Sequence, residues 1–187
     1  ISSNVDAKST ITWPSVVLSD SSNGTIAYAT ANPTTFIKKN SKNYDWYYTG
    51  SSSTDNTRWT TSESSKSIYD PCPSGWRVPD GGGTGVWAKA LGSSSYFACI
   101  YNTIDKGMNF SRKFGSASTI WYPASGTRSK SDGVLSGISA IGHYWSASSD
   151  SYGAYCLSYD FSDSVDPSCC IISRAPGYSV RCVRESK

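Results

Sequence analysis

Few residues in this chain of 187 have side chains suited to covalent chemistry. Nucleophilic catalysis needs a base that activates a serine or cysteine, and His143 is the single histidine. It precedes Tyr144 and Trp145 in an apolar run, a context that favours a packed histidine over a catalytic one. Glycoside hydrolysis needs two carboxylates at a set separation in space, which spacing along the chain neither predicts nor excludes. The sequence therefore predicts no catalytic residues and a protein that is not an enzyme.

The residues that could bind a metal ion, namely aspartate, cysteine and histidine, form no convincing site either. Asp160, Asp163 and Asp166 offer oxygen ligands for calcium, but they match no EF-hand loop, and we interpret them as solvated loop carboxylates. Zinc is disfavoured because no cysteine pair has CxxC spacing and the chain has one histidine. The three glycines at 81–83 lack the Gly-Lys-Ser/Thr ending of a phosphate loop. The sequence thus predicts neither a metal nor a cofactor.

The cysteines are compatible with an oxidising compartment, and six cysteines allow fifteen pairings among which the sequence does not choose. A bond between the adjacent Cys169 and Cys170 would be strained, so free thiols or an outside partner are equally consistent there. The six are Cys72, Cys99, Cys156, Cys169, Cys170 and Cys182.

A recognition surface is the better hypothesis for the stretch 142–184. Apolar residues alternate there with a strand period between turn-forming residues, and the positions between them follow no packing rule. The alternation predicts that odd-numbered residues of 155–161 face the core and that even-numbered ones face solvent or ligand. The alternative is an ordinary surface without a ligand. The predicted binding patch consists of Ser149, Asp150, Tyr152, Cys156, Ser158, Asp160, Asp163, Cys169, Cys170 and Ile172.

Length and composition limit the class of protein. The chain fits one domain, 1–187, able to bury about 70% of the surface of its unfolded form. The net charge is +3, and the cationic residues are scattered along the chain. A pI of about 8.5 is low for a nucleic-acid-binding domain. No run of about 20 apolar residues exists to span a membrane. Because the chain begins with Ile1, we expect a processed or trimmed piece of a longer exported protein.

The elements that must position these residues are short. Residues 13–18 and 25–29 are expected to be strands, so that 1–31 is either an N-terminal strand pair or the remnant of a linker. The aromatic run 44–48 suits a core cluster better than a sugar-stacking surface. Apolar spacing predicts a short helix over 86–91. Residues 96–101 are expected to carry Cys99 into the core, and residues 102–115 are expected to be loop.

Four motifs, in this order and spacing, resemble the Fibrobacter succinogenes major paralogous domain. The resemblance covers residues 32–184, and the pieces 32–37 and 44–46 resemble the lead-in of gut bacterial members. The motifs are DPCPSGWRVP at 70–79, YPASGTR at 122–128, YWSAS at 144–148 and GYSVRCVR at 177–184.

The resemblance implies an α+β, C-type-lectin-like fold that is loop-rich, with short helices around a twisted, mostly antiparallel sheet. It implies an exported cell-surface domain with a ligand-binding or adhesive role, and a disulfide between Cys72 and Cys182, which lie in two of the motifs. Some proteins of this fold are variable near the C-terminus, and the fold also includes a formylglycine-generating enzyme. The calcium motifs of sugar-binding C-type lectins are absent here.

We therefore predict an extracellular or cell-surface domain of a longer exported protein. It would recognise a host or bacterial surface protein or a glycan through its variable C-terminal surface, without nucleic acid and without inserting into a membrane. The alternatives are a structural unit of a fimbria-like surface assembly and, with less support, a hydrolase or modifying enzyme.

Overall fold

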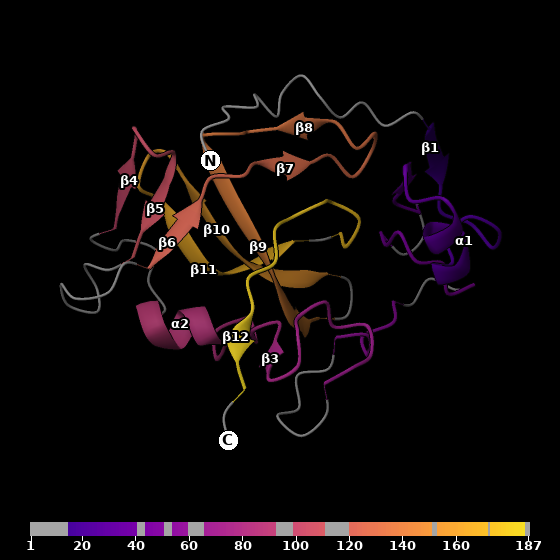
Figure 1. Cartoon of the computed structure of the whole chain (residues 1–187), viewed down its shortest axis with the longest axis horizontal. Coiled ribbons are helices and arrows are strands. Elements are labelled where there is room, and N and C mark those ends of the chain that lie inside the picture. The colour runs from indigo at the N-terminus through magenta and orange to yellow at the C-terminus, as the bar shows by residue number, and fades with distance from the viewer. Residues whose placement is uncertain are drawn as a thin grey trace.

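A computed structural model describes residues 15–40, 44–50, 54–59, 66–92, 99–110, 120–150, 153–171 and 173–185, with the backbone alone at Cys170. The described residues form an α+β, sheet-rich architecture of small, mostly antiparallel sheets and two short helices (Figure 1). The elements are β1 (Ser15–Leu18), α1 (Ile26–Ala31), β2 (Thr35–Lys38), β3 (Trp76–Arg77), α2 (Val86–Leu91), β4 (Ile100–Asn102), β5 (Gly107–Asn109), β6 (Trp121–Pro123), β7 (Thr127–Arg128), β8 (Leu135–Ser136), β9 (Ile141–Ser149), β10 (Ala154–Asp160), β11 (Val165–Ile171) and β12 (Val183–Arg184).

The longest strands build the central sheet, in the order β11-β10-β9. Both pairs are antiparallel, and β10 lies in the middle. One face of β10 presents Leu157 and Tyr159, which are buried against Tyr144 of β9 and Val165 of β11. The predicted strands of this region are confirmed. This face forms the main core together with Trp87, Leu91, Cys99, Tyr101, Met108, Phe110, Tyr122 and Ala124.

The aromatic residues of the core also satisfy their polar atoms. The Tyr159 hydroxyl donates to the Tyr122 carbonyl over 2.6 Å, and the Tyr144 hydroxyl donates to the Pro123 carbonyl over 2.6 Å. Burial raises the pKa of Tyr144 to about 12. Trp87 of α2 donates its indole N–H to the Tyr122 hydroxyl. These bonds hold β6 and α2 on the central sheet without leaving buried polar atoms unpaired.

The helix predicted over 86–91 is confirmed as α2, but the strand predicted over 25–29 is wrong. Thr25 is the N-cap of α1, and its hydroxyl accepts the Tyr28 N–H over 3.0 Å. The helix connects β1 to β2, which pair in parallel. The expected N-terminal strand pair is therefore replaced by a strand–helix–strand unit. Residues 1–14 lie outside the described residues.

Residues 102–110 are not simply a loop, and residues 111–115 of the expected loop lie outside the described residues. β5 pairs with β4 and β6 in a three-stranded antiparallel sheet, and buried Met108 opposes Tyr101 and Tyr122 in register. The sequence signal was weak because β5 has three residues and one of them is Gly107. Cys99 is buried, as predicted.

The segment between Asp70 and Pro79 is tied down by one carboxylate and one disulfide. Asp70 accepts the N–H of Cys72 over 2.8 Å and that of Val78 over 3.0 Å. Cys72 and Cys182 are joined in a disulfide beside the β3–β12 pair. The C-terminal strand is therefore held covalently to a rigid, proline-rich loop.

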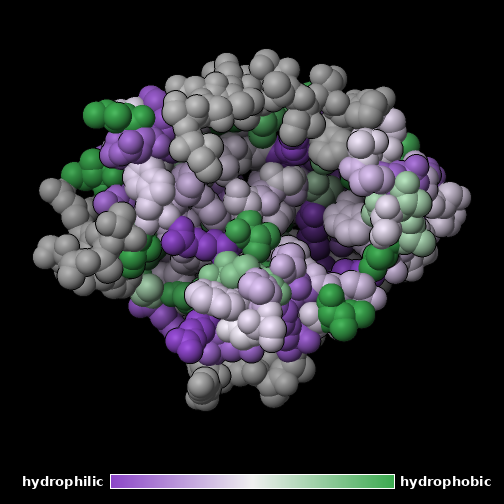
Figure 2. Space-filling model, viewed as in Figure 1, coloured by the Kyte–Doolittle hydropathy of each residue, from purple (hydrophilic) through white to green (hydrophobic). Residues whose placement is uncertain are grey.

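Hydrophobic side chains on the surface form separate small groups among polar ones in the view of Figure 2. Among the large hydrophobic residues described, Ile68 and Ile104 are the most exposed, and they lie in different parts of the chain. Among the residues described, no helix is long and apolar enough to cross a membrane.

Candidate functional site

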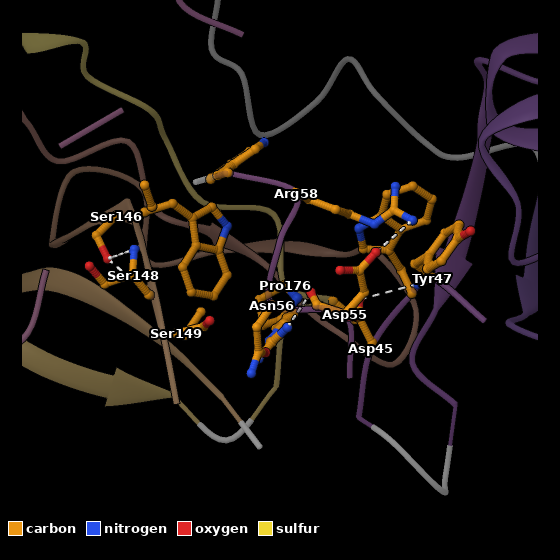
Figure 3. A pocket seen from close by; sticks show the side chains of 16 residues that line it. Asp45, Tyr47, Asp55, Asn56, Arg58, Ser146, Ser148, Ser149 and Pro176 are labelled. Atoms are coloured by element: carbon orange, nitrogen blue, oxygen red, sulfur yellow. Dashed lines mark hydrogen bonds and ion pairs between the residues drawn. The ribbon is translucent and has the colours of Figure 1, made fainter. Parts of the chain in front are cut away.

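A cavity of about 230 Å³ opens at one end of the central sheet, between four segments that are far apart in sequence. They are residues 45–47, residues 55–59, the end of β9 with the start of β10, and residues 174–176. Figure 3 shows their side chains around the cavity. We call this site the aromatic cleft, after Trp46, Tyr47, Trp59 and Trp145, which line it.

The cleft aromatics are fixed by neighbouring groups. The Trp145 ring packs on Tyr178 with 4.3 Å between centroids, and the Trp59 indole N–H donates to the Tyr69 carbonyl over 3.0 Å. The Arg58 guanidinium lies over the Tyr47 ring, 3.4 Å from its centroid. Trp46 contacts the edge of Tyr47, and its own ring is only half-buried. The cleft thus offers flat apolar surfaces with set orientations.

Arg174 connects three walls of the cleft. Its guanidinium donates to the carbonyls of Gly153, Asp55 and Asp150 over 2.9–3.1 Å, and also to the Asn56 side chain. Its backbone N–H donates to the Tyr44 carbonyl over 3.0 Å. Burial lowers the pKa of Arg174 from its ordinary value, and nearby carboxylates oppose this effect. The guanidinium therefore acts as a half-buried cation that links the walls of the cleft.

Two carboxylates in the cleft have opposite environments. Asp45 is 5% exposed, and burial raises its pKa although the Tyr47 N–H and Arg174 oppose this shift. Hydrogen bonds from the Thr57 hydroxyl and N–H lower the pKa of Asp55. Asp55 also pairs with Arg58 at 3.3 Å. Both aspartates interact electrostatically with Arg58 and Arg174.

Serines and an amide supply the remaining polar groups. Ser148 accepts the Gly81 N–H over 3.0 Å, and Ser146 donates to the Tyr155 carbonyl over 2.8 Å. Ser149 and Asn56 complete the lining near Arg174. Hydroxyl and amide groups next to indole rings can bind a ligand that is both hydroxylated and apolar.

The predicted patch is only partly gathered by the structure. Ser149 lines the cleft, and Asp150 borders it, since its carbonyl accepts from Arg174. Asp160 and Asp163 lie at the opposite end of β10, about 20 Å away at 3.3 Å per residue. Both carboxylates accept backbone N–H groups. Asp160 accepts from the nearby Ser162, and Asp163 accepts from Tyr101 of β4. Their role in binding stays a prediction.

Cys156 corrects the predicted patch. It is 0% exposed, so it presents no surface to a ligand. The second face of β10 is covered as well, since Tyr178 packs there on His143 and Trp145 and lies near Cys156. Cys169 opposes Cys156 on β11 and is half-buried. Tyr152, Ile172 and the Cys170 side chain lie outside the described residues.

His143 and Ser158 form a contact on this second face. The Ser158 hydroxyl lies 3.2 Å from His143 Nε2, and the imidazole stacks on Tyr178 with 4.6 Å between centroids. Burial lowers the pKa of His143. The imidazole is therefore packed on an aromatic ring, while its lack of a catalytic role stays a prediction. Within the described part of the chain, no group of three or more histidine, cysteine or acidic residues is placed to hold a metal ion.

Sequence reasoning missed the cleft although it noticed some of its parts. The run 44–48 was expected to be a core cluster, yet Tyr44 is exposed and Trp46 and Tyr47 line the cavity. One signal in the sequence could have indicated the cleft. Residues 44–48 and 58–59 both combine aromatic with polar side chains, as the lining of a binding site does. Comparison with protein families, curated proteins and solved structures found no match for this chain.

Proposed function

We propose that this chain is a ligand-binding domain of the cell surface that holds a glycan in the aromatic cleft. The main support for this proposal is the arrangement of indole rings and hydrogen-bonding side chains around one cavity. A sugar ring has an apolar face that packs on an aromatic ring and hydroxyls that pair with amides, serines and carboxylates. The C-type-lectin-like fold and the extracellular location implied by the motif resemblance belong to the same proposal.

The charge of the cleft favours a neutral sugar. Arg58 is paired with Asp55, and Arg174 makes its hydrogen bonds to the walls. Recognition of an acidic sugar would compete with these interactions, since both guanidinium groups would have to exchange a partner. The volume of about 230 Å³ is below the usual range for drug-sized ligands, which suits the terminal unit of a glycan chain.

The cysteine chemistry supports the proposed extracellular location. A disulfide joins Cys72 to Cys182, and such bonds persist mainly in oxidising compartments.

A glycan array, followed by calorimetric titration of the best neutral glycan, tests the proposal. The informative variant is Trp46→Ala, because this indole lines the cleft and is only half-buried. We expect at least tenfold weaker binding, equal to about 1.4 kcal/mol. The matched control is Trp76→Ala, which removes an indole 43% exposed and outside the cleft, and it should bind like the parent.

Two results would reject this function. One is the absence of any glycan bound by the parent domain, and the other is equal affinity of the parent and Trp46→Ala. A preference for sulfated or uronic-acid glycans would keep the site but overturn the argument for a neutral sugar.

A further inference from the structure

Two thiols face each other across the central sheet, behind the wall of the aromatic cleft. Cys156 of β10 is the register partner of Cys169 on β11, and on its other side it is the partner of Trp145 on β9. Neither cysteine belongs to the Cys72–Cys182 disulfide. The alternation of the sheet therefore places both side chains on the face away from the main core.

The geometry of directly opposed residues suits a covalent bond. In an antiparallel pair, opposed Cα atoms lie about 4.5–5.5 Å apart. Disulfides span Cα separations of about 4.4–6.8 Å. Cys156 and Cys169 are directly opposed in the register of β10 and β11, so the separation expected for their Cα atoms falls within the range that a disulfide spans. A bond between the two cysteines is therefore compatible with the pairing of the strands.

We propose that Cys156 and Cys169 are a redox-active dithiol that closes to a second disulfide when the domain meets an oxidised thiol reagent. This site is independent of the glycan proposal. It uses the same sheet, but it concerns residues that do not line the cleft.

The two cysteines have different parts in the reaction. Cys169 is half-buried and accessible to a small reagent, whereas Cys156 is fully buried. The hydrogen bond from Cys156 lowers the pKa of Cys169, against the opposing effects of burial and Asp166. A lower pKa raises the fraction of thiolate, which is the nucleophile in disulfide exchange. Cys169 is therefore the attacking thiol and Cys156 the resolving thiol.

The exchange balances with a small-molecule disulfide such as oxidised glutathione as the oxidant. The Cys169 thiolate attacks one reagent sulfur, the reagent S–S bond breaks and the first reagent thiolate leaves. The Cys156 thiolate then attacks the Cys169 sulfur of the mixed disulfide and releases the second reagent thiolate. The two protons of the protein thiols end on the two reagent thiols. The protein loses two electrons, and the reagent gains them.

Peptide mapping of the whole chain tests the proposal. The protein is equilibrated with oxidised glutathione, remaining thiols are blocked, and the chain is digested without reduction by trypsin together with a protease that cuts before aspartate. Cys156 then lies in peptide 150–159, and Cys169 lies with Cys170 in peptide 166–174. We expect these two peptides to be linked after oxidation and separate after reduction. The Cys72–Cys182 linkage serves as the internal control for folding and oxidation.

Variants decide which thiols are joined. The linkage should survive in Cys170→Ser and in Cys99→Ser and should be lost in Cys169→Ser and in Cys156→Ser. Oxidation should also raise the Tm of the parent by about 5 °C, since the new disulfide closes the loop of residues 156–169. The Tm of Cys169→Ser should stay unchanged.

Two outcomes overturn the proposal. The first is a linkage that persists in Cys169→Ser and disappears in Cys170→Ser, which would assign the bond to the neighbouring cysteine. The second is an oxidised parent that contains the Cys72–Cys182 linkage but no link between peptides 150–159 and 166–174.

Discussion

The two ends of the β9–β10–β11 sheet differ in how their polar groups find partners. At the end near Asp160, the loop closes on itself, because the Asp160 N–H donates to the Ser164 carbonyl and its carboxylate accepts from Ser162. At the other end, Arg174 reaches across three segments and leaves a cavity between them. A turn whose polar groups form hydrogen bonds with each other is compact. Segments that are linked only through one long side chain can leave space for a ligand between them.

This difference predicts that the cleft end depends strongly on a single residue. Arg174→Ala removes a bridging cation and leaves three part-buried carbonyls without this donor. We expect a loss of about 3 kcal/mol in the free energy of unfolding, and a fall in Tm of about 9 °C. Glycan binding should be lost as well, because the walls separate.

Denaturation followed by circular dichroism measures the effect of Arg174→Ala. Its matched control is Arg184→Ala, which changes an exposed arginine of β12 and should stay within about 0.5 kcal/mol of the parent. Equal midpoints for the two variants would mean that Arg174 does not hold the walls together.

A close approach at the back of the cleft gives the second prediction. A Cβ atom on Gly81 would meet Ser146 Oγ and lie 2.6–2.7 Å from the Cβ atoms of Ser146 and Tyr155, whereas one on Gly83 would meet nothing within 4 Å. We expect Gly81→Ala to cost about 2 kcal/mol through overpacking and Gly83→Ala to be neutral or slightly stabilising. Urea denaturation of both variants measures the difference. Similar midpoints would show that the loop with Gly81 can move away from Ser146 and Tyr155 without loss in the free energy of unfolding.

The smallest effect is expected at the closed end. Asp163 has a φ of +65° and accepts the Tyr101 N–H over 2.6 Å. Asp163→Ala removes the acceptor and leaves a residue that disfavours this left-handed conformation, at a cost of about 1 kcal/mol. Asp163→Asn keeps an oxygen acceptor and tolerates the conformation, so thermal unfolding should show a smaller loss.

Glycan binding also distinguishes the two ends of the β9–β10–β11 sheet. Asp163→Ala should bind as tightly as the parent, because the residue lies at the far end of β10. A loss of binding in this variant would extend the recognition surface along the whole hairpin, as the sequence first suggested.

Local patterns predicted individual elements well where the relevant contacts are local. The helix over 86–91 follows from apolar spacing, and the strands of 142–171 follow from alternation. The same alternation misplaced Cys156, because it tells which residues share a face and not what covers that face. Phe161 was expected in the core, yet it is 66% exposed because β10 ends at Asp160.

The sequence by itself determined the strand period, the short helix and the aromatic character of residues 44–48 and 58–59. Only the tertiary structure decided that these aromatics line one cavity, and that Cys156 meets Cys169. The physical reason is distance along the chain. Arg174 and Asp55 are 119 positions apart, and their hydrogen bond forms only once several sheets have packed. No periodicity or composition within one segment carries information about such a contact.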